Sequence, residues 1–498
     1  MEDVDKSELT RGRTAGWVLL MGSAYAMRAL MSIASAAILG RLLTPVDFGL
    51  VATAGPLMAL IGLIQSLGIN QALIQHRTIE RGHVNALFYV MLGAGAALAL
   101  GLVLSARLAA DFFGEPRLEA ILWAFAGVSV LSAALLTPIG LLNRRLKFAQ
   151  MATIDVAAGI AGLASGVAFA AATHSYWALV VMQGANTLVQ FALALAFSGW
   201  LPGRATFDAT VKRMLGFGAG FSVFELFNFL SRNADNLLIA RVHGAGPLGL
   251  YDRAYKLMLT PLQQAIGPFS RVMVPLLARL QDTPALYRQR YFDATTALMV
   301  ATHPPLVVAC IFNEAAIRLV LGAQWMAAAP IFFWLSLTSL HQVYSTPQGW
   351  LFVSQGRGRE FAVVGIVTSG IAVASFAAGL AWGPVGVAMG YAIGNYLLTV
   401  PFAWWMAGRR GPVRRRGLIA SVAPHAAALA ACAALLAGLK QAWPALGLVG
   451  LAASTAASYA AYLAVLALFP EKRRLLGEGW RGLVKRLRGF SATRASSA

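Results

Sequence analysis

Long apolar segments alternate with short polar stretches along almost the whole chain. Most of these segments have the ~20 residues that a helix needs to cross ~30 Å of hydrocarbon. Their approximate bounds are 15–39, 47–70, 84–106, 119–142, 151–172, 177–199, 214–240, 249–277, 295–317, 327–353, 361–382, 384–406, 418–438 and 446–469. The pattern predicts an all-α polytopic membrane protein with about 14 transmembrane helices.

Composition agrees with this prediction. Of the 498 residues, 58% are hydrophobic and 12% are charged, and the mean hydropathy is +0.67. A soluble fold cannot bury that much apolar surface. The first apolar segment is too long for a signal peptide and no A-x-A cleavage site follows it, so we expect it to remain as a transmembrane helix. Cys310 and Cys432 lie in separate apolar segments, and we interpret both as small buried apolar residues.

The basic residues predict how the chain is oriented. With the N-terminus in the cytoplasm and every segment crossing, 29 of the 40 Lys and Arg residues fall in inner stretches and 6 fall in outer loops. This positive-inside bias places both termini in the cytoplasm. It also accounts for the net charge of +20 without nucleic acid as a partner. The tail fits either a basic amphipathic helix on the inner leaflet or a solvated basic segment.

A short internal repeat indicates two related halves. The stretches "LGRLLTPVDFGL" (39–50) and "IARVHGAGPLGL" (239–250) align at an offset of 200 residues, which pairs Arg41 with Arg241 and Gly49 with Gly249. Two six-helix halves with the substrate site between them are a common transporter plan. We expect two pseudo-symmetric six-helix lobes plus two C-terminal helices. The predicted divisions are an N-terminal lobe at 1–208, a C-terminal lobe at 209–407, helices 13 and 14 at 408–470, and a basic amphipathic cytoplasmic tail at 471–498.

Polar residues form stripes on three of the apolar segments. The segment 214–240 carries Glu225, Asn228, Arg232, Asp235 and Asn236 on one helical face. At the repeat offset, the first segment carries Arg28, Ser32, Ser35 and Ala36, and the segment 249–277 carries Asp252, Lys256, Thr260 and Arg271 with Arg253 at its edge. A charge at mid-bilayer costs at least ~2.5–3.5 kcal/mol, so such residues usually face a cavity or a partner. The stripes predict a net basic cavity near the midplane.

A basic cavity favours an anionic ligand, because phosphate binds arginine through charge-assisted and often bidentate hydrogen bonds. The predicted diphosphate-binding residues are Arg28, Arg232, Arg253, Lys256 and Arg271. The predicted ion-coupling or structural residues are Glu225, Asp235 and Asp252. Two alternatives stay open. Arg232 and Asp235 can form a structural ion pair one turn apart, and the cluster Asp252, Arg253 and Lys256 can extend to the outer interface.

Several sequence motifs are absent. The sequence has no GxxxxGK[ST] loop, no HExxH motif, no paired metal ligands and no loop long enough for a soluble catalytic domain. We therefore expect a transporter rather than an enzyme, without a cofactor or metal, and with H⁺ or Na⁺ as candidate coupling ions. The seven histidines are scattered, and we expect structural roles for His303 and His341.

Three stretches carry a resemblance to a known family. They are "LGRLLTPVDFGLVA", "RNADNLLIARVHGAGPLGLYDRAYKLMLTP" and "GPVGVAMGYAIGN". With these stretches, residues 12–470 resemble the polysaccharide-transporter branch of the multidrug, oligosaccharidyl-lipid and polysaccharide exporter superfamily. The first two stretches are typical of the lipopolysaccharide and colanic-acid type of flippase.

The resemblance implies a function. A member of this branch would move an undecaprenyl-diphosphate-linked oligosaccharide from the cytoplasmic to the periplasmic leaflet of the bacterial inner membrane, for exopolysaccharide or O-antigen synthesis. Movement would occur by alternating access between the two lobes. In the related lipid II flippases, arginines of a central cavity bind the diphosphate, which indicates Arg28, Arg232 and Arg271 here. Two extra helices form a groove for the lipid tail there. The bilayer, and the polymerase and glycosyltransferases of the pathway, would be partners.

Two other functions fit the sequence less well. A cation-coupled multidrug exporter of the same superfamily usually takes cationic ligands, for which a net basic cavity is a poor host. A membrane-embedded polysaccharide polymerase or ligase would be expected to carry a large outer loop, whereas the outer loops of this chain are all short.

Overall fold

The computed structural model describes residue 27 and residues 31–66, 80–208, 211, 222–443, 447–473 and 477. Within these ranges the regular structure is helical and no strand occurs, which confirms the all-α prediction. Nine helical stretches of the described residues are long and apolar enough to cross a membrane. The count of fourteen crossings stays a prediction, since most of the first predicted segment lies outside these ranges. Most of the predicted basic tail 471–498 also lies outside them.

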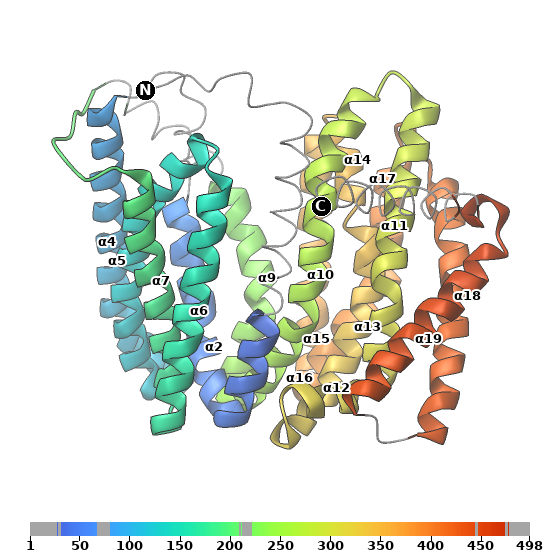
Figure 1. Cartoon of the computed structure of the whole chain (residues 1–498), viewed down its shortest axis with the longest axis horizontal. Helices are drawn as coiled ribbons and strands as arrows, with labels where there is room; N and C mark the ends of the chain where they lie inside the picture. Colours follow the sequence, from blue (N-terminus) through green and yellow to red (C-terminus); the bar gives the residue numbers. More distant parts are fainter. Residues whose placement is uncertain are drawn as a thin grey trace, which may run out of the picture. The chain divides into compact units, whose positions relative to one another are not determined.

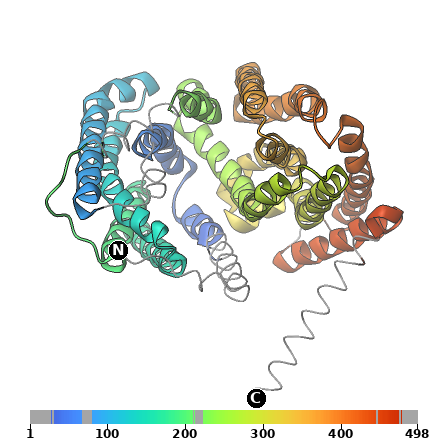
Figure 2. The ribbon, with the colours of Figure 1, turned by 90° about the horizontal axis from the view of Figure 1, so that it is seen from above.

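The chain divides into two compact units. The first comprises Met1–Gln264, Val320–Ile331 and Ser369–Tyr391. Its helices are Met31–Leu42, α2 (Pro45–Ser66), α4 (Arg81–Phe113), α5 (Arg117–Arg144), α6 (Phe148–Thr173), α7 (Trp177–Ser198), α9 (Ser222–His243), the first part of α10 (Ala245–Arg279), the short helices Ala323–Ala328 and Leu380–Trp382, the second half of α15 (Gly358–Gly379) and most of α16 (Gly383–Gly394). In Figures 1 and 2, α4 packs along α5 and α6 packs along α7. Buried side chains of α2, α4 and α5 form the larger core of this unit.

The second unit comprises Ala265–Leu319, Phe332–Thr368 and Ala392–Ala498. Its helices are the remainder of α10, α11 (Pro284–Ile311), α12 (Asn313–Val320), α13 (Ala329–Ser345), α14 (Gln348–Ser354), the first half of α15 (Gly358–Gly379), α17 (Val400–Gly408), α18 (Arg415–Ala442) and α19 (Leu448–Ala467). The helices α18 and α19 form a hairpin that packs on α11 (Figures 1 and 2). Val307, Cys432 and Tyr462 lie in the core that joins these three helices.

The described helices follow the predicted segments, and interruptions occur beside prolines. The segment 327–353 is divided because α13 ends at Ser345 and α14 begins at Gln348, with Pro347 between them. Proline has no N–H, and its ring clashes with the carbonyl four residues earlier. A π-helical turn, Asn395–Thr399, likewise precedes Pro401 in the segment 384–406. The predicted lobe boundaries, which rest on the repeat, stay a prediction.

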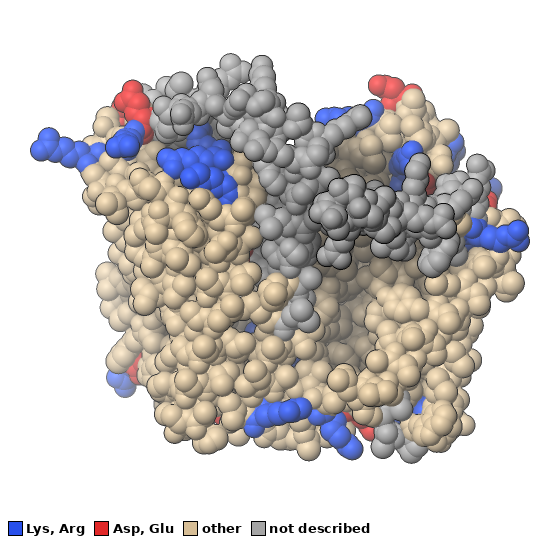
Figure 3. Space-filling view, viewed as in Figure 1, with Lys and Arg blue, Asp and Glu red and all other residues tan. Residues whose placement is uncertain are grey.

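The surface of the described residues suits a lipid environment. Leu104 and Leu108 of α4 expose 71% and 72% of their surface, and Ile160 of α6 exposes 57%. Large apolar patches on a water-exposed surface favour aggregation, whereas lipid solvates them. On the visible face of each unit in Figure 3, charged atoms of the described residues lie toward the helix ends, and uncharged atoms cover the stretch between. The chain is therefore a multi-pass membrane protein.

Candidate functional site

The two halves of the repeat meet within the first unit, where α2 crosses the start of α10. A Cβ atom at Gly49 would collide with the backbone carbonyl of Ala245, and one at Gly249 would collide with the carbonyl of Pro45. Residues 45 and 245 are themselves separated by the repeat offset of 200, so the contact is reciprocal. Two helix backbones can approach this closely only where neither carries a side chain. The crossing agrees with the predicted pseudo-symmetry.

Aromatic side chains surround this crossing. The Phe48 ring lies edge-on to Trp325, with 5.3 Å between ring centroids. The Arg253 guanidinium lies over the ring of Phe48, 4.4 Å from its centroid. The indole Nε1–H of Trp325 donates to the carbonyl of Gly40 at 2.7 Å. That carbonyl lies in the last turn of Met31–Leu42, where helix carbonyls have no helical partner, so the indole and the side-chain amide of Gln324 supply hydrogen bonds to it.

One buried carboxylate on α10 holds two cations. The Asp252 side chain is 5% exposed, and its Oδ1 lies 2.8 Å from the Lys256 ammonium. Its Oδ2 lies 2.9 Å from Nη2 of Arg253. The cluster carries a net charge of +1 when all three groups are ionised. Lys256 remains 54% exposed, so its ammonium is oriented by Asp252 and still has donors available for a ligand.

These cations line a cavity of about 190 Å³ in the first unit. Its other lining residues come from Met31–Leu42, from α7 and from the next turns of α10. The full lining is Ser32, Ile33, Ser35, Ala36, Met182, Arg253, Lys256, Leu257, Thr260 and Pro261. The structure thus brings together the serines of the first predicted stripe and two of the basic residues of the third. Hydroxyl donors and two cations facing one space suit an oxygen-rich anion.

The carboxylate of Asp235, on the polar stripe of α9, is held by groups other than the cations of the cavity. Its side chain is buried, and its Oδ2 accepts a hydrogen bond of 2.9 Å from the hydroxyl of Tyr251. Its Oδ1 accepts from the backbone N–H of Asn236 at 2.8 Å. Among the described residues no ion pair joins it to Arg232, whose side chain is exposed. Asp235 therefore connects α9 to α10 through Tyr251.

The remaining predicted residues fall into two groups. Arg28 lies outside the described residues, and so does the side chain of Glu225. Arg271 is exposed on the later part of α10, within the second unit, and does not line the cavity of the first unit. Sequence reasoning missed Tyr251 and Trp325, whose single polar atoms lie on otherwise apolar rings. Within the described ranges, no group of three or more His, Cys, Asp or Glu side chains is arranged to hold a metal ion.

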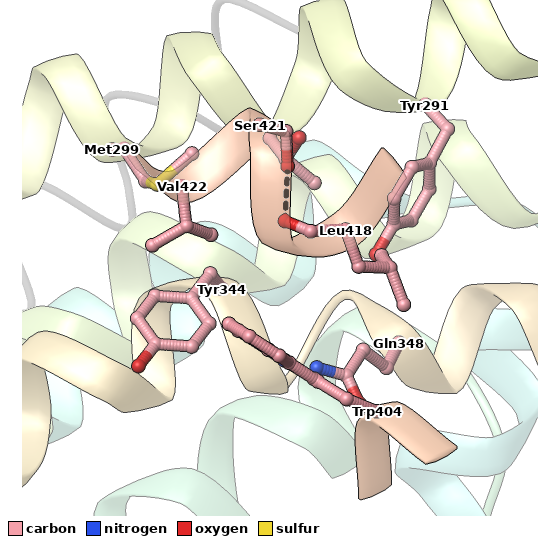
Figure 4. Close-up of a pocket in the computed structure, with 9 residues that line it drawn as sticks. Tyr291, Met299, Tyr344, Gln348, Trp404, Leu418, Ser421 and Val422 are labelled. Atoms are coloured by element: carbon pink, nitrogen blue, oxygen red, sulfur yellow. Dashed lines mark hydrogen bonds between the residues drawn. The ribbon is translucent and has the colours of Figure 1, made fainter. Parts of the chain in front are cut away.

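A second cavity lies within the second unit (Figure 4), between α11, α13, α14, α17 and α18. Its volume is about 10 Å³, which holds about one water molecule. In Figure 4 the amide of Gln348 lies beside the ring of Trp404, which in turn lies near Tyr344. Both polar atoms of this amide are buried without a hydrogen-bond partner among the described residues. The cavity is too small for a substrate group, and we assign the candidate site to the first unit.

Apolar helices, a reciprocal crossing between repeats and a cation-lined cavity define a multi-pass membrane protein with a charged interior site. The chain belongs to the family described as polysaccharide biosynthesis protein, whose family model matches residues 38–330. This membership confirms the family resemblance seen in the sequence.

Curated relatives are similar over large parts of the chain. The lipopolysaccharide biosynthesis protein WzxC of Escherichia coli is 25% identical over 332 residues, which is 64% of this chain and 65% of that protein. The chain therefore spans slightly less than two thirds of the length of WzxC. The teichuronic acid biosynthesis protein TuaB of Bacillus subtilis is 24% identical over 66% of this chain and 68% of its own length. The succinoglycan biosynthesis transport protein ExoT of Rhizobium meliloti is 24% identical over 84% of both chains.

Solved structures show the same fold. The lipid II flippase MurJ in an inward closed conformation superimposes with a TM-score of 0.70 at 12% identity, covering 92% of this chain and 99% of MurJ. An inward-facing multidrug transporter of the MATE family gives a TM-score of 0.62 at 13% identity, covering 81% and 98%. At these identities the likeness concerns the fold alone.

Proposed function

We propose that this protein is a flippase that moves a lipid-linked oligosaccharide from the cytoplasmic to the periplasmic leaflet of the bacterial inner membrane, for the synthesis of a surface polysaccharide. WzxC, TuaB and ExoT are named for the biosynthesis of lipopolysaccharide, teichuronic acid and succinoglycan, and ExoT is named as a transport protein. The observation that carries the proposal is the cavity lined by Arg253 and Lys256 inside a unit of apolar helices.

The chemistry of this cavity favours a diphosphate headgroup. Lys256 and Arg253 offer charge-assisted hydrogen bonds to phosphoryl oxygens, and Ser32, Ser35 and Thr260 offer hydroxyl donors. The volume of about 190 Å³ lies below the ~300–1,000 Å³ of pockets that enclose a drug-sized ligand. The cavity therefore suits the charged link of an undecaprenyl-diphosphate oligosaccharide, with the sugars and the isoprenoid chain outside it. A cationic drug would be repelled by the same groups.

The reciprocal crossing supports alternating access. Backbone contact between Gly49 and Gly249 leaves no side chains to interlock, so the two helices can change their angle about the crossing with little repacking. In the predicted topology this crossing lies toward the outer side. Trp325, bonded to Gly40 and packed on Phe48, would close the outer side in this conformation.

For ion coupling, Asp235 is the better placed of the acidic candidates. Asp252 is already neutralised by two cations, whereas Asp235 accepts only from Tyr251 and from a backbone N–H among the described residues. We propose Asp235 as the group that takes up H⁺ or Na⁺, and Asp252 as the group that orients the cations of the cavity.

The proposal is tested by removing the exposed cation. Lys256→Gln keeps a polar hydrogen-bonding side chain, although a shorter one, and loses the charge, whereas Lys256→Arg keeps the charge. We expect Lys256→Gln to reduce export at least tenfold, which corresponds to ~1.4 kcal/mol of lost ligand binding. Lys256→Arg should retain most of the export.

The measurement is accumulation of undecaprenyl-diphosphate-linked oligosaccharide in the inner leaflet, together with loss of surface polysaccharide. Lys147→Gln, at the start of α6 and away from the cavity, is the matched control. All variants must be present in the membrane at equal amounts. Normal export by Lys256→Gln would refute the assignment of the cavity to the diphosphate.

A further inference from the structure

A series of polar contacts fastens the α18–α19 hairpin to α11 in the second unit. The Tyr459 hydroxyl donates to the Ala301 carbonyl at 2.6 Å, and the Ser458 hydroxyl donates to the Pro304 carbonyl at 3.2 Å. Near the two ends, Lys440 donates to the Ile311 carbonyl, and Lys472 donates to the Thr296 hydroxyl. These contacts extend from Thr296 to Ile311, so they fix the register of the hairpin along α11.

A pair of prolines, Pro304 and Pro305, lies within this docked part of α11. Pro305 has no N–H, so the carbonyl of Ala301, four residues earlier, lacks its helical partner. The Tyr459 hydroxyl supplies that hydrogen bond from α19. A backbone group left unpaired in the hydrocarbon would cost several kcal/mol. The hairpin and the part of α11 around the proline pair therefore pack as one structural element.

Two histidines and a tyrosine lie at the centre of this docking, and all three are fully buried. Nδ1 of His303 on α11 lies 2.8 Å from the Tyr462 hydroxyl on α19, and Nδ1 of His425 on α18 lies 2.7 Å from the same hydroxyl. Nε2 of His303 lies 3.2 Å from the Leu340 carbonyl on α13. One hydroxyl thus joins the rings of two helices.

The donors in this chain follow from the chemistry of each group. The Leu340 carbonyl only accepts, so Nε2 of His303 carries the proton, and Nδ1 of the neutral ring accepts from the Tyr462 hydroxyl. The hydroxyl has one proton, so its oxygen accepts from Nδ1–H of His425. Nε2 of His425 is then a bare acceptor. It is buried and has no hydrogen-bond partner among the described residues.

We propose that His303, Tyr462 and His425 form a proton-binding site whose neutral state holds the α18–α19 hairpin on α11 and whose protonation loosens it. A proton added at Nε2 of His425 has no acceptor among the described residues. A proton added at Nδ1 of His303 removes the acceptor of the Tyr462 hydroxyl. Either event leaves a buried donor unpaired and introduces a buried charge, and both are costly in an apolar interior. Binding of a proton therefore favours separation of the hairpin from α11.

The charged surroundings act in the same direction. The cation that faces His425 is Lys472, which follows α19 and is buried. Burial lowers the pKa of Lys472, and the nearby carboxylates Glu471 and Asp293 oppose that shift. While Lys472 is charged, it repels a proton on His425 in the docked state. The α13 side contributes the Leu340 carbonyl, and α18 and α19 contribute no further charge at this level among the described residues.

Cys432 provides a native reporter for the loosening. It is fully buried on α18, and its thiol donates to the Ser458 carbonyl of α19 at 3.3 Å. The chain has two cysteines, so Cys310→Ala leaves Cys432 alone. In that background, with the full chain in lipid nanodiscs, the rate of alkylation by N-ethylmaleimide would be measured from about pH 8 to about pH 5.5, the range in which histidine titrates.

The double variant His303→Asn with His425→Asn is the diagnostic reference, because neither amide titrates. At position 425 the Nδ2–H takes the place of Nδ1–H and donates to Tyr462, and at position 303 the Oδ1 takes the place of Nδ1 and accepts from it. At each pH, the alkylation rate of Cys432 in the Cys310→Ala protein is divided by its rate in the double variant, and this ratio removes the dependence on the thiolate fraction. We expect this ratio to rise severalfold on acidification. Tyr462→Phe should label rapidly at every pH.

Tyr459→Phe is the matched control on α19, because it loses one hydroxyl outside the three-residue site and should keep the pH response. A flat ratio between pH 8 and pH 5.5 would overturn the proposal, as would loss of the pH response in Tyr459→Phe. The experiment needs no substrate, so its failure would leave the proposed flippase function untouched.

Discussion

The crossing of α2 and α10 makes a sharp prediction about glycine. Gly49→Ala places a Cβ atom against the carbonyl of Ala245, which is backbone and cannot rotate away. Gly55, six residues later on α2, has open space around its own Cβ position. Glycine inside a helix is less stable than alanine by roughly 0.5–1 kcal/mol, so Gly55→Ala is expected to stabilise the protein by about that amount.

The collision at Gly49 reverses the sign. Overpacking costs ~1–3 kcal/mol even where side chains can yield. After the helix-propensity gain is subtracted, Gly49→Ala should destabilise the protein by roughly 1–2 kcal/mol. Gly249→Ala should do the same, since its Cβ meets the carbonyl of Pro45. The double variant should cost less than the sum, because helices already separated by one methyl group admit the second more easily.

Thermal unfolding of the purified chain in one detergent, followed by size-exclusion chromatography, measures these differences. The midpoint should fall for Gly49→Ala and Gly249→Ala and rise slightly for Gly55→Ala. Export by the two crossing variants should fall more than their loss of folded protein accounts for, because the angle between the helices can no longer change freely. Equal midpoints for Gly49→Ala and Gly55→Ala would refute the close backbone contact. Strictly additive losses would show that the two glycines do not share one crossing.

Four further outcomes are expected. Tyr251→Phe removes a donor to a buried carboxylate and should lower the free energy of unfolding by about 1–3 kcal/mol in thermal unfolding. Asp235→Asn should leave folded protein in the membrane and flatten the dependence of transport on a proton or sodium gradient; an intact dependence would leave Asp235 a structural residue. Trp325→Phe keeps the ring contact but loses a hydrogen bond, with a cost of about 0.5–1.5 kcal/mol in the same unfolding assay. Reporter fusions after Lys147 should report the cytoplasm and those after Gly244 the outer side, and a reversed pair would contradict the predicted topology.

Parts of the candidate site could be read from single helices. The stripe on 249–277 included Asp252, Arg253 and Lys256, and the structure places the two cations against the serines of the first stripe. The repeat paired Gly49 with Gly249, and the structure places these glycines at one crossing. Helical periodicity shows which residues share a face, and burying charge in lipid is costly enough that a charged face indicates a cavity or a partner.

Partners across helices could not be read in this way. The polar stripe of α9 suggests an ion pair between Asp235 and Arg232, whereas the carboxylate of Asp235 accepts a hydrogen bond from Tyr251 of the next helix. The sequence indicates a structural role for His303 but does not indicate its partners. In the structure, the Tyr462 hydroxyl lies against the rings of both His303 and His425. Tyrosine and histidine on an apolar face give no sign of what their polar atoms will meet.

The sequence by itself determined the class of this protein. Segment length, hydropathy and the side on which basic residues lie are local properties, and the membrane acts on each segment separately. Only the tertiary structure decided which polar atoms pair. His303 and Tyr462 are 159 residues apart, and their hydrogen bond exists because α11 and α19 pack at one register. That register is fixed by the fit of many apolar side chains and by the hydrogen bonds from α19 to the carbonyls of Ala301 and Pro304. The donors and the acceptors lie on different segments, so no single segment shows that they pair.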